Sequence, residues 1–198
     1  MRIIFFFIPI AFFAASSGFS QTDSTEKKNL FILKTDVLIP GINLLMGNQV
    51  LDLSIEFGFH KRYSVQLTGI NMNIRNGGIY NKAYSNYLIQ DYKYFLKNEK
   101  TYSGFYTGAY CDQIFVHAIA DTHPVYHIDY KTITIGGGPI IGYQTYFSKQ
   151  KFSFDFIFGL GRSYVVKREF IRLEGTDDVL IPPSDFDLRL AVNFGYRF

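Results

Sequence analysis

The last fourteen residues, DFDLRLAVNFGYRF (185–198), alternate strictly between two kinds of side chain. Every second position is aromatic or aliphatic, namely Phe186, Leu188, Leu190, Val192, Phe194, Tyr196 and Phe198. The positions between them are mostly charged, polar or small. A period of two predicts a β-strand with one apolar face, whereas a helix would spread the same residues around its circumference. Residues 151–160 and 51–60 repeat this pattern and predict two more strands.

Five weaker segments predict further strands, which brings the expected number to eight. They are residues 29–39, 62–74, 86–97, 102–117 and 130–147. Within 62–74 the apolar positions shift by one, which predicts a β-bulge near Gly69. The facing of 102–117 (YSGFYTGAYCDQIFVH) stays open, because aromatic and small residues occur on both sides of that strand.

The composition excludes several classes of protein. The chain has 198 residues, of which 47% are hydrophobic, 18% aromatic and 19% charged, with one cysteine, Cys111. Enough apolar residues are present to exclude a disordered chain, and a lone cysteine excludes a disulfide scaffold. The excess of basic over acidic residues, 20 against 17, is too weak to suggest nucleic-acid binding.

The N-terminus predicts an export signal. Arg2 precedes an apolar run at 3–15, which is too short to span a bilayer, and small residues follow it. We expect residues 1–20 to be a signal peptide cleaved before Gln21. Residues 21–28 then form a polar lead-in, and residues 29–198 form the folded domain.

The connections between the predicted strands alternate in length. Short links lie near residues 60–61, 98–100 and 148–150, and long ones at 40–48, 75–85, 118–129 and 167–183. This asymmetry is typical of bacterial outer-membrane barrels, whose periplasmic turns are short and whose extracellular loops are long. The pattern predicts an eight-stranded antiparallel transmembrane β-barrel that begins and ends in the periplasm.

The two faces of the predicted strands indicate which side points inward. Stripes of phenylalanine such as those at 152–158 would overfill the interior of a small soluble barrel, whereas on the outside they would contact lipid. We therefore expect a network of charges in the interior, because isolated buried charges are costly. A soluble periplasmic barrel is the alternative. The expected interior residues are Lys34, Asp36, Asp52, Glu56, Asp91, Lys93, Lys151, Asp155, Asp187, Arg189 and Arg197.

Several motifs resemble a known family. They are NLFILKTD (29–36), LDLSIEFGF (51–59), YLIQDYKYFL (87–96), GFYTGAY (104–110), GGGPIIGYQ (136–144), FDFIFGLGRSY (154–164) and FGYRF (194–198). Together they resemble the small outer-membrane β-barrel proteins of the Bacteroidetes group called DUF3575, over about residues 29–198. The resemblance implies a fold and a location but no activity. Tyr196 and Phe198 resemble the C-terminal signal that the outer-membrane assembly machinery reads.

Three weaker hypotheses concern chemistry. His117, Asp121, His123 and His127 fall in the third long link, where they could form a metal site or, with Ser85 or Ser163, a hydrolase constellation. The carboxyl groups of Asp52, Glu56, Asp91 and Asp155 could form a hydrolytic pair, although an interior salt-bridge network explains them better.

The leading functional hypothesis is a structural scaffold or a loop-mediated binding protein with a filled interior. The alternatives are an enzyme that modifies outer-membrane lipids and a narrow channel or small-ligand transporter. We expect no cofactor and no catalytic residue. The expected partners are outer-membrane lipids, lipopolysaccharide and the barrel assembly machinery, and the expected state is a monomer.

Overall fold

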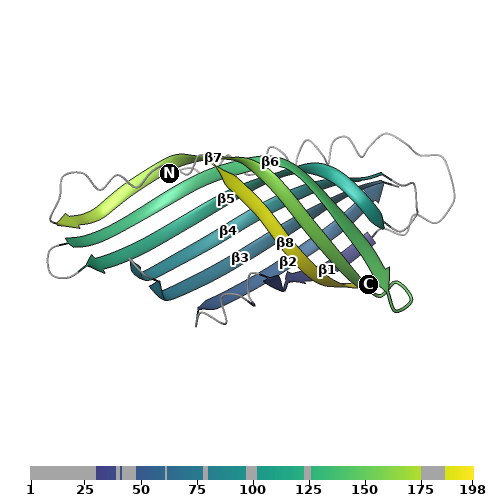
Figure 1. The fold of residues 1–198 in the computed structure, drawn as a ribbon, viewed down its shortest axis with the longest axis horizontal. Coiled ribbons are helices and arrows are strands. Elements are labelled where there is room, and N and C mark those ends of the chain that lie inside the picture. The colour runs from purple at the N-terminus through teal and green to yellow at the C-terminus, as the bar shows by residue number, and fades with distance from the viewer. Residues whose placement is uncertain are drawn as a thin grey trace.

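The chain forms a closed barrel of eight antiparallel strands (Figure 1). The computed structural model describes residues 30–38, 41, 48–60, 62–77, 80–96, 102–122, 126–174 and 186–198. The strands are β1 (Leu30–Asp36), β2 (Gln49–His60), β3 (Tyr63–Gly77), β4 (Tyr80–Phe95), β5 (Gly104–Thr122), β6 (Tyr126–Phe147), β7 (Phe152–Glu174) and β8 (Asp187–Arg197). The predicted all-β, eight-stranded barrel is confirmed. The predicted signal peptide and lead-in lie outside the described residues.

Pairing between the first and last strands closes the barrel. Leu33 of β1 faces Ile55 of β2 on one side and Tyr196 of β8 on the other. Each strand therefore has two hydrogen-bonded neighbours, and the barrel leaves no open sheet edge along these pairings. Within the described residues no helix is both long enough and apolar enough to cross a membrane.

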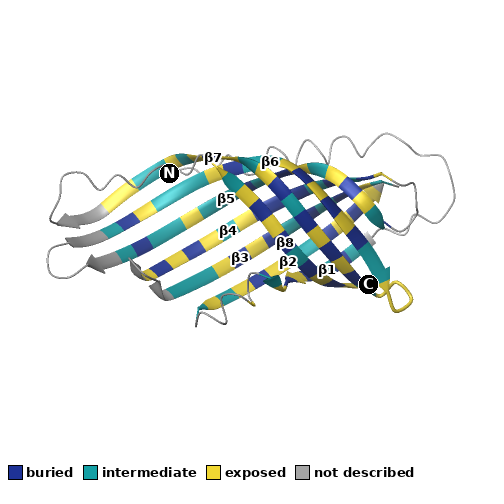
Figure 2. Ribbon diagram, in the orientation of Figure 1, coloured by how far each residue is buried: buried dark blue, intermediate teal, exposed yellow. Residues whose placement is uncertain are grey.

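Exposure alternates along the strands, with the polar residues on the buried side (Figure 2). On β2, Leu51 and Leu53 are 71% and 51% exposed, whereas Asp52 and Glu56 are at most 5% exposed. The same inversion occurs on β8, where Arg189 is buried between the exposed Leu188 and Leu190. The barrel thus turns its charges inward and its large apolar side chains outward.

The bulge predicted near Gly69 is absent, and that prediction is wrong. Strand β3 keeps one register with β2 and with β4 through Gly69, and the irregularity between β2 and β3 lies instead at Gly58 to His60. Ile70 is therefore buried in the interior at 5% exposure. The bulge was predicted on the premise that an apolar residue such as Ile70 faces outward. The interior, however, also holds apolar side chains beside its charges.

Three of the predicted long links are shorter than expected, because strands occupy much of them. β3 ends only at Gly77 and β4 already begins at Tyr80. In the same way β5 ends at Thr122 and β6 begins at Tyr126. β7 likewise runs on to Glu174. The wall is consequently taller along β5, β6 and β7 than along β1 and β8 (Figure 1). Apolar alternation fades in these extensions, so backbone pairing rather than side-chain pattern defines them.

Replacing Gly108 on β5 tests how closely the backbones of β4 and β5 approach each other. A Cβ atom added at Gly108 would lie 1.8 Å from the backbone oxygen of Tyr92, which cannot move without disturbing β4. We predict that Gly108→Ala lowers the free energy of unfolding by about 1–3 kcal/mol. Gly69→Ala is the matched control, since nothing lies within 4 Å of its added Cβ. Denaturant titration of the refolded variants measures both, and equal stabilities would contradict the close approach.

Candidate functional site

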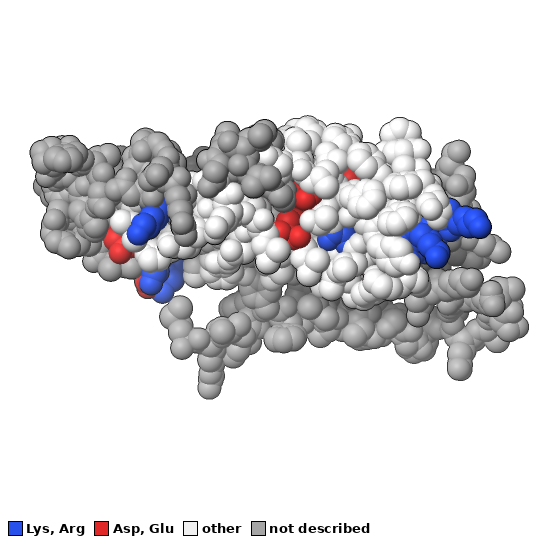
Figure 3. All heavy atoms as spheres, turned by 90° about the horizontal axis from the view of Figure 1, so that it is seen from below, with Lys and Arg blue, Asp and Glu red and all other residues white. Residues whose placement is uncertain are grey.

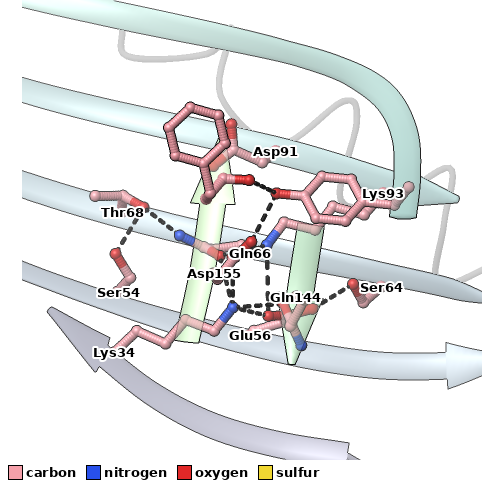
Figure 4. Close-up of polar contacts among 12 residues, drawn as sticks. Lys34, Ser54, Glu56, Ser64, Gln66, Thr68, Asp91, Lys93, Gln144 and Asp155 are labelled. Carbon is pink, nitrogen blue, oxygen red and sulfur yellow. Dashed lines mark hydrogen bonds and ion pairs between the residues drawn. The ribbon is translucent and has the colours of Figure 1, made fainter. Parts of the chain in front are cut away.

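Four charged side chains meet inside the barrel (Figure 4). Lys34 on β1 and Lys93 on β4 place their Nζ atoms 2.7 and 2.6 Å from Oδ2 of Asp155 on β7. Lys34 also forms an ion pair with Glu56 on β2, and the Nζ atom of Lys93 lies 3.5 Å from Oε2 of Glu56. β1 and β4 are not neighbours of β7, so these contacts cross the interior. We call these four residues the charge quartet.

Uncharged polar groups complete the quartet's hydrogen bonds. Oε1 of Gln66 accepts from Lys34 and Lys93 at 3.3 and 2.7 Å, and Oε1 of Gln144 accepts from Lys34 at 2.8 Å. The hydroxyl of Tyr106 donates to Oδ1 of Asp155 at 2.7 Å, and that of Ser64 donates to Glu56 at 2.5 Å. Two cations and two carboxylates balance in charge. Such saturation is what a buried ionic cluster needs to offset desolvation.

A second, more acidic group lies further along the interior. The guanidinium of Arg189 donates twice to Asp91, at 3.3 and 2.9 Å. The backbone N–H of Asp36 donates to Asp52 at 3.1 Å, and the hydroxyl of Tyr110 donates to Asp187 at 2.8 Å. Arg189 is the cation of this group, and it is outnumbered by the carboxyl groups around it. They belong to Asp36, Asp52, Asp91, Asp112 and Asp187.

The structure brings most of the predicted interior charges together. Eight are buried, namely Lys34, Asp36, Asp52, Glu56, Asp91, Lys93, Asp155 and Arg189. Asp187 is half-buried beside Tyr110, and Arg197 is half-buried over the ring of Tyr146, 5.7 Å from its centroid. The suggested hydrolytic pair is not favoured, because cations already hold Glu56, Asp91 and Asp155.

Lys151 does not belong to the interior, and that prediction is wrong. It is exposed in the turn between β6 and β7, which ends before Phe152. Ser148, Lys149 and Gln150 have φ values of 50, 56 and 67°, a left-handed path that reverses the chain. Strand alternation therefore starts one residue later than the sequence pattern suggested.

Sequence reasoning missed several interior residues. Asp112 is 8% exposed, and Tyr106 and Tyr110 are buried with their hydroxyls on carboxylates. All three lie on β5, whose facing the sequence left open, and an inward tyrosine has the same sequence signature as an outward one. Placing Asp112 inward would have revealed the others, because residues two apart share a face.

Among the residues that the structure describes, the predicted histidine cluster is not assembled. His117 lies on the outer face of β5, where its Nε2 atom is 2.9 Å from Oδ1 of Asp129. Asp121 and His127 face each other in the register of β5 and β6, and His123 lies outside the described residues. In the part of the chain that the structure describes, no three His, Cys, Asp or Glu side chains are placed to hold a metal ion.

The two candidate serines face away from His117. Ser85 and Ser163 are 5% and 3% exposed, and both lie on the interior side of their strands. In the β4–β5 register His117 is opposite Tyr84, one position from Ser85, so the histidine and that serine lie on opposite faces of the wall. The structure therefore does not bring His117 into reach of either hydroxyl.

Aromatic rings surround the barrel at the end with the short connections. Neighbouring rings in this girdle lie 4.9–6.3 Å apart. Figure 3 shows one face on which charged side chains form small separate groups and uncharged side chains cover most of the described surface. The girdle contains Phe31, Phe57, Phe59, Tyr63, Tyr94, Phe105, Tyr143, Phe147, Phe152, Phe194, Tyr196 and Phe198, which come from or adjoin all eight strands.

Replacing one lysine tests the quartet. Lys34→Met leaves Glu56 and Asp155 with one shared lysine in a buried site, so we predict a loss of about 3–5 kcal/mol in the free energy of unfolding. Lys151→Met is the control and should change stability by less than about 0.5 kcal/mol, because Lys151 is exposed in a turn. Urea titration of the refolded variants measures both. Similar stabilities for the two variants would refute the role of the quartet.

Comparison with known proteins identifies the family. The family described as "Protein of unknown function (DUF3575)" matches residues 7–179, which is most of the chain but does not include the final FGYRF. No curated protein matches, and no solved structure matches. The chain belongs to the DUF3575 family, as its sequence motifs suggested.

Proposed function

We propose that this protein is a barrel of the bacterial outer membrane that acts as a plugged scaffold. In this proposal residues 1–20 direct export, the wall contacts lipid, and the end with the long connections binds partners at the cell surface. One observation carries the proposal: large apolar side chains cover the outside while charged side chains fill the inside. In water the opposite arrangement would be favoured, because apolar surface is costly to hydrate.

The height of the apolar wall supports a membrane location. Tyr84 lies ten positions from Tyr94 of the girdle along β4, and Phe186 lies ten positions from Tyr196 at β8. At about 3.3 Å per residue and a tilt of about 40°, ten positions rise about 25 Å along the barrel axis. This equals the apolar band of outer-membrane barrels, which is bordered by aromatic residues on both sides. Asn73 lies ten positions from Tyr63 on β3, where a polar border is expected.

The charge quartet supports a scaffold rather than an open pore. Its four side chains come from β1, β2, β4 and β7 and meet at the centre of the barrel, with Gln66 and Gln144 against them. A barrel of eight strands has an interior just wide enough for side chains to fill. The proposed function therefore resides in the outer surface and the long connections.

The girdle supports the proposed orientation. Tyr196 and Phe198 lie in the girdle with ring centroids 5.1 Å apart, at the end that we propose faces the periplasm. Exposed C-terminal aromatic side chains suit recognition by the barrel assembly machinery. The chain closes its own sheet, so we propose a monomer whose partners are membrane lipids and ligands of the long connections.

Cysteine labelling in intact cells tests both location and orientation. In a Cys111→Ser background, we predict that a membrane-impermeant maleimide labels Lys82→Cys on intact cells, because Lys82 is exposed near the β3–β4 connection. Lys151→Cys, in the short turn between β6 and β7, should be labelled only after the outer membrane is permeabilised.

Two results would contradict the proposal. Labelling of neither site before permeabilisation, with the protein in the soluble periplasmic fraction, would indicate a soluble barrel. Labelling of residue 151 but not residue 82 on intact cells would reverse the orientation. The Cys111→Ser chain without a new cysteine is the control for background labelling.

A further inference from the structure

The outer wall has a shallow hollow between β6 and β7. Its volume is about 640 Å³, and it is lined by Ile135, Gly136, Gly137, Gly138, Pro139, Leu160, Gly161, Arg162 and Tyr164. Glycines and a proline form its floor, while larger side chains border it. The hollow is a recess in a surface that elsewhere carries projecting leucine and phenylalanine side chains.

The floor of the hollow coincides with an interruption in the sheet. Pairing between β6 and β7 includes Gly137 with Arg162 and resumes at Ile140 with Gly159 in the same register, so two successive pairs are missing. Pro139 lies in this gap and has no N–H to donate. Gly137 pairs with Arg162 and shares its outward face, and a Cβ on Gly137 would lie 2.7 Å from the backbone oxygen of Tyr110, so a side chain there would have to displace β5. The recess is therefore fixed by the backbone.

Arg162 provides the charge in this recess. Its side chain is exposed between Leu160 and Tyr164, which are 42% and 63% exposed and lie on the same face of β7. Among the described residues no carboxylate pairs with Arg162. An unpaired guanidinium on an apolar wall lacks a counterion, and a lipid phosphate can accept two hydrogen bonds from it.

The position of Arg162 suits a lipid phosphate. Arg162 lies ten positions after Phe152 of the girdle, which corresponds to about 25 Å along the axis and hence to the opposite edge of the apolar band. Phosphate groups lie at that level in a membrane, and acyl chains extend from it toward the middle. The recess extends along β6 and β7 on both sides of Arg162, and the part at Leu160 and Pro139 lies in the direction that an acyl chain would follow.

We propose that this recess binds one molecule of phosphorylated lipid A, with a phosphate on Arg162 and an acyl chain over the floor at Gly137, Gly138 and Pro139. The inference rests on the proposed function, because lipid A occupies the outer leaflet, which the long-connection end would face. Recessed backbone gives the chain close contact, and Arg162 gives the phosphate its counter-charge.

A second hollow, of about 370 Å³, lies further along the same wall and is a weaker candidate. His117, Lys131, Lys167 and Glu169 line it. Lys167 already pairs with Glu169 and lowers the pKa of that carboxyl, and His117 already contacts Asp129. Lys131 remains as a cation in this hollow, but it lies close enough to Glu169 to lower the pKa of that carboxyl, whereas no carboxylate among the described residues pairs with Arg162.

Lipid titration followed by native mass spectrometry tests the site. The full mature chain, refolded in dodecyl maltoside, is titrated with bis-phosphorylated lipid A and with the same lipid A after removal of its phosphates. We expect a one-to-one complex whose half-saturation concentration is at least fivefold lower for the phosphorylated lipid. Arg162→Gln should abolish this difference, Arg162→Lys should retain part of it, and Pro139→Leu should weaken binding of both lipids by filling the floor.

Lys82→Gln is the matched control, since Lys82 is an exposed cation on β4 that lines neither hollow. Equal loss in Arg162→Gln and Lys82→Gln, or no preference for the phosphorylated lipid, overturns the inference. If these results occur while residue 82 is labelled on intact cells, the proposed membrane barrel survives and only the lipid site fails. If that labelling also fails, both proposals fail. Circular dichroism of each variant checks that the barrel has folded.

Discussion

The barrel depends on the mutual neutralisation of Lys34, Glu56, Lys93 and Asp155 in its interior. These side chains come from β1, β2, β4 and β7, and β7 adjoins none of the other three, so the contacts of Asp155 connect parts of the wall that share no backbone hydrogen bonds. An apolar exterior requires the polar face of every strand to point inward. Charges placed there must find partners, and the quartet together with Gln66 and Gln144 supplies them.

The outer wall follows from the same alternation but is not uniform. Most outward positions carry large apolar or aromatic side chains, which form an apolar outer surface bordered by the girdle at one end. Opposite Arg162 the outward position of β6 is Gly137, where a Cβ would meet the backbone of Tyr110 on β5. This packing requirement creates a recess beside Arg162, which is where we propose that a phosphorylated lipid binds.

The sequence predicted the number of strands, their order and the inward direction of most charges, because period-two alternation is strong where one face is apolar and the other is charged. It failed where that contrast is weak. The alternation wrongly predicts Ile70 on the outer face although it packs inside, and it leaves the facing of β5 open because aromatic residues occur on both faces of that strand. The alternation predicts Lys151 in the interior, but Lys151 belongs to a turn. That turn depends on positive φ angles, which the sequence does not reveal. The partners of the quartet could not be predicted, because contacts across a barrel depend on register and stagger.

The central claim is that the barrel folds with its apolar face toward lipid, and electrophoretic mobility tests this most directly. The protein is transferred from urea into detergent micelles, and heated and unheated samples are compared on a denaturing gel. A closed barrel in micelles should resist the gel's detergent, so the unheated sample should migrate faster than the heated one and change to the slower position after boiling. Migration of the unheated sample as an unfolded chain in every detergent and lipid tested, or folding to the same compact form in water without detergent, would contradict the account.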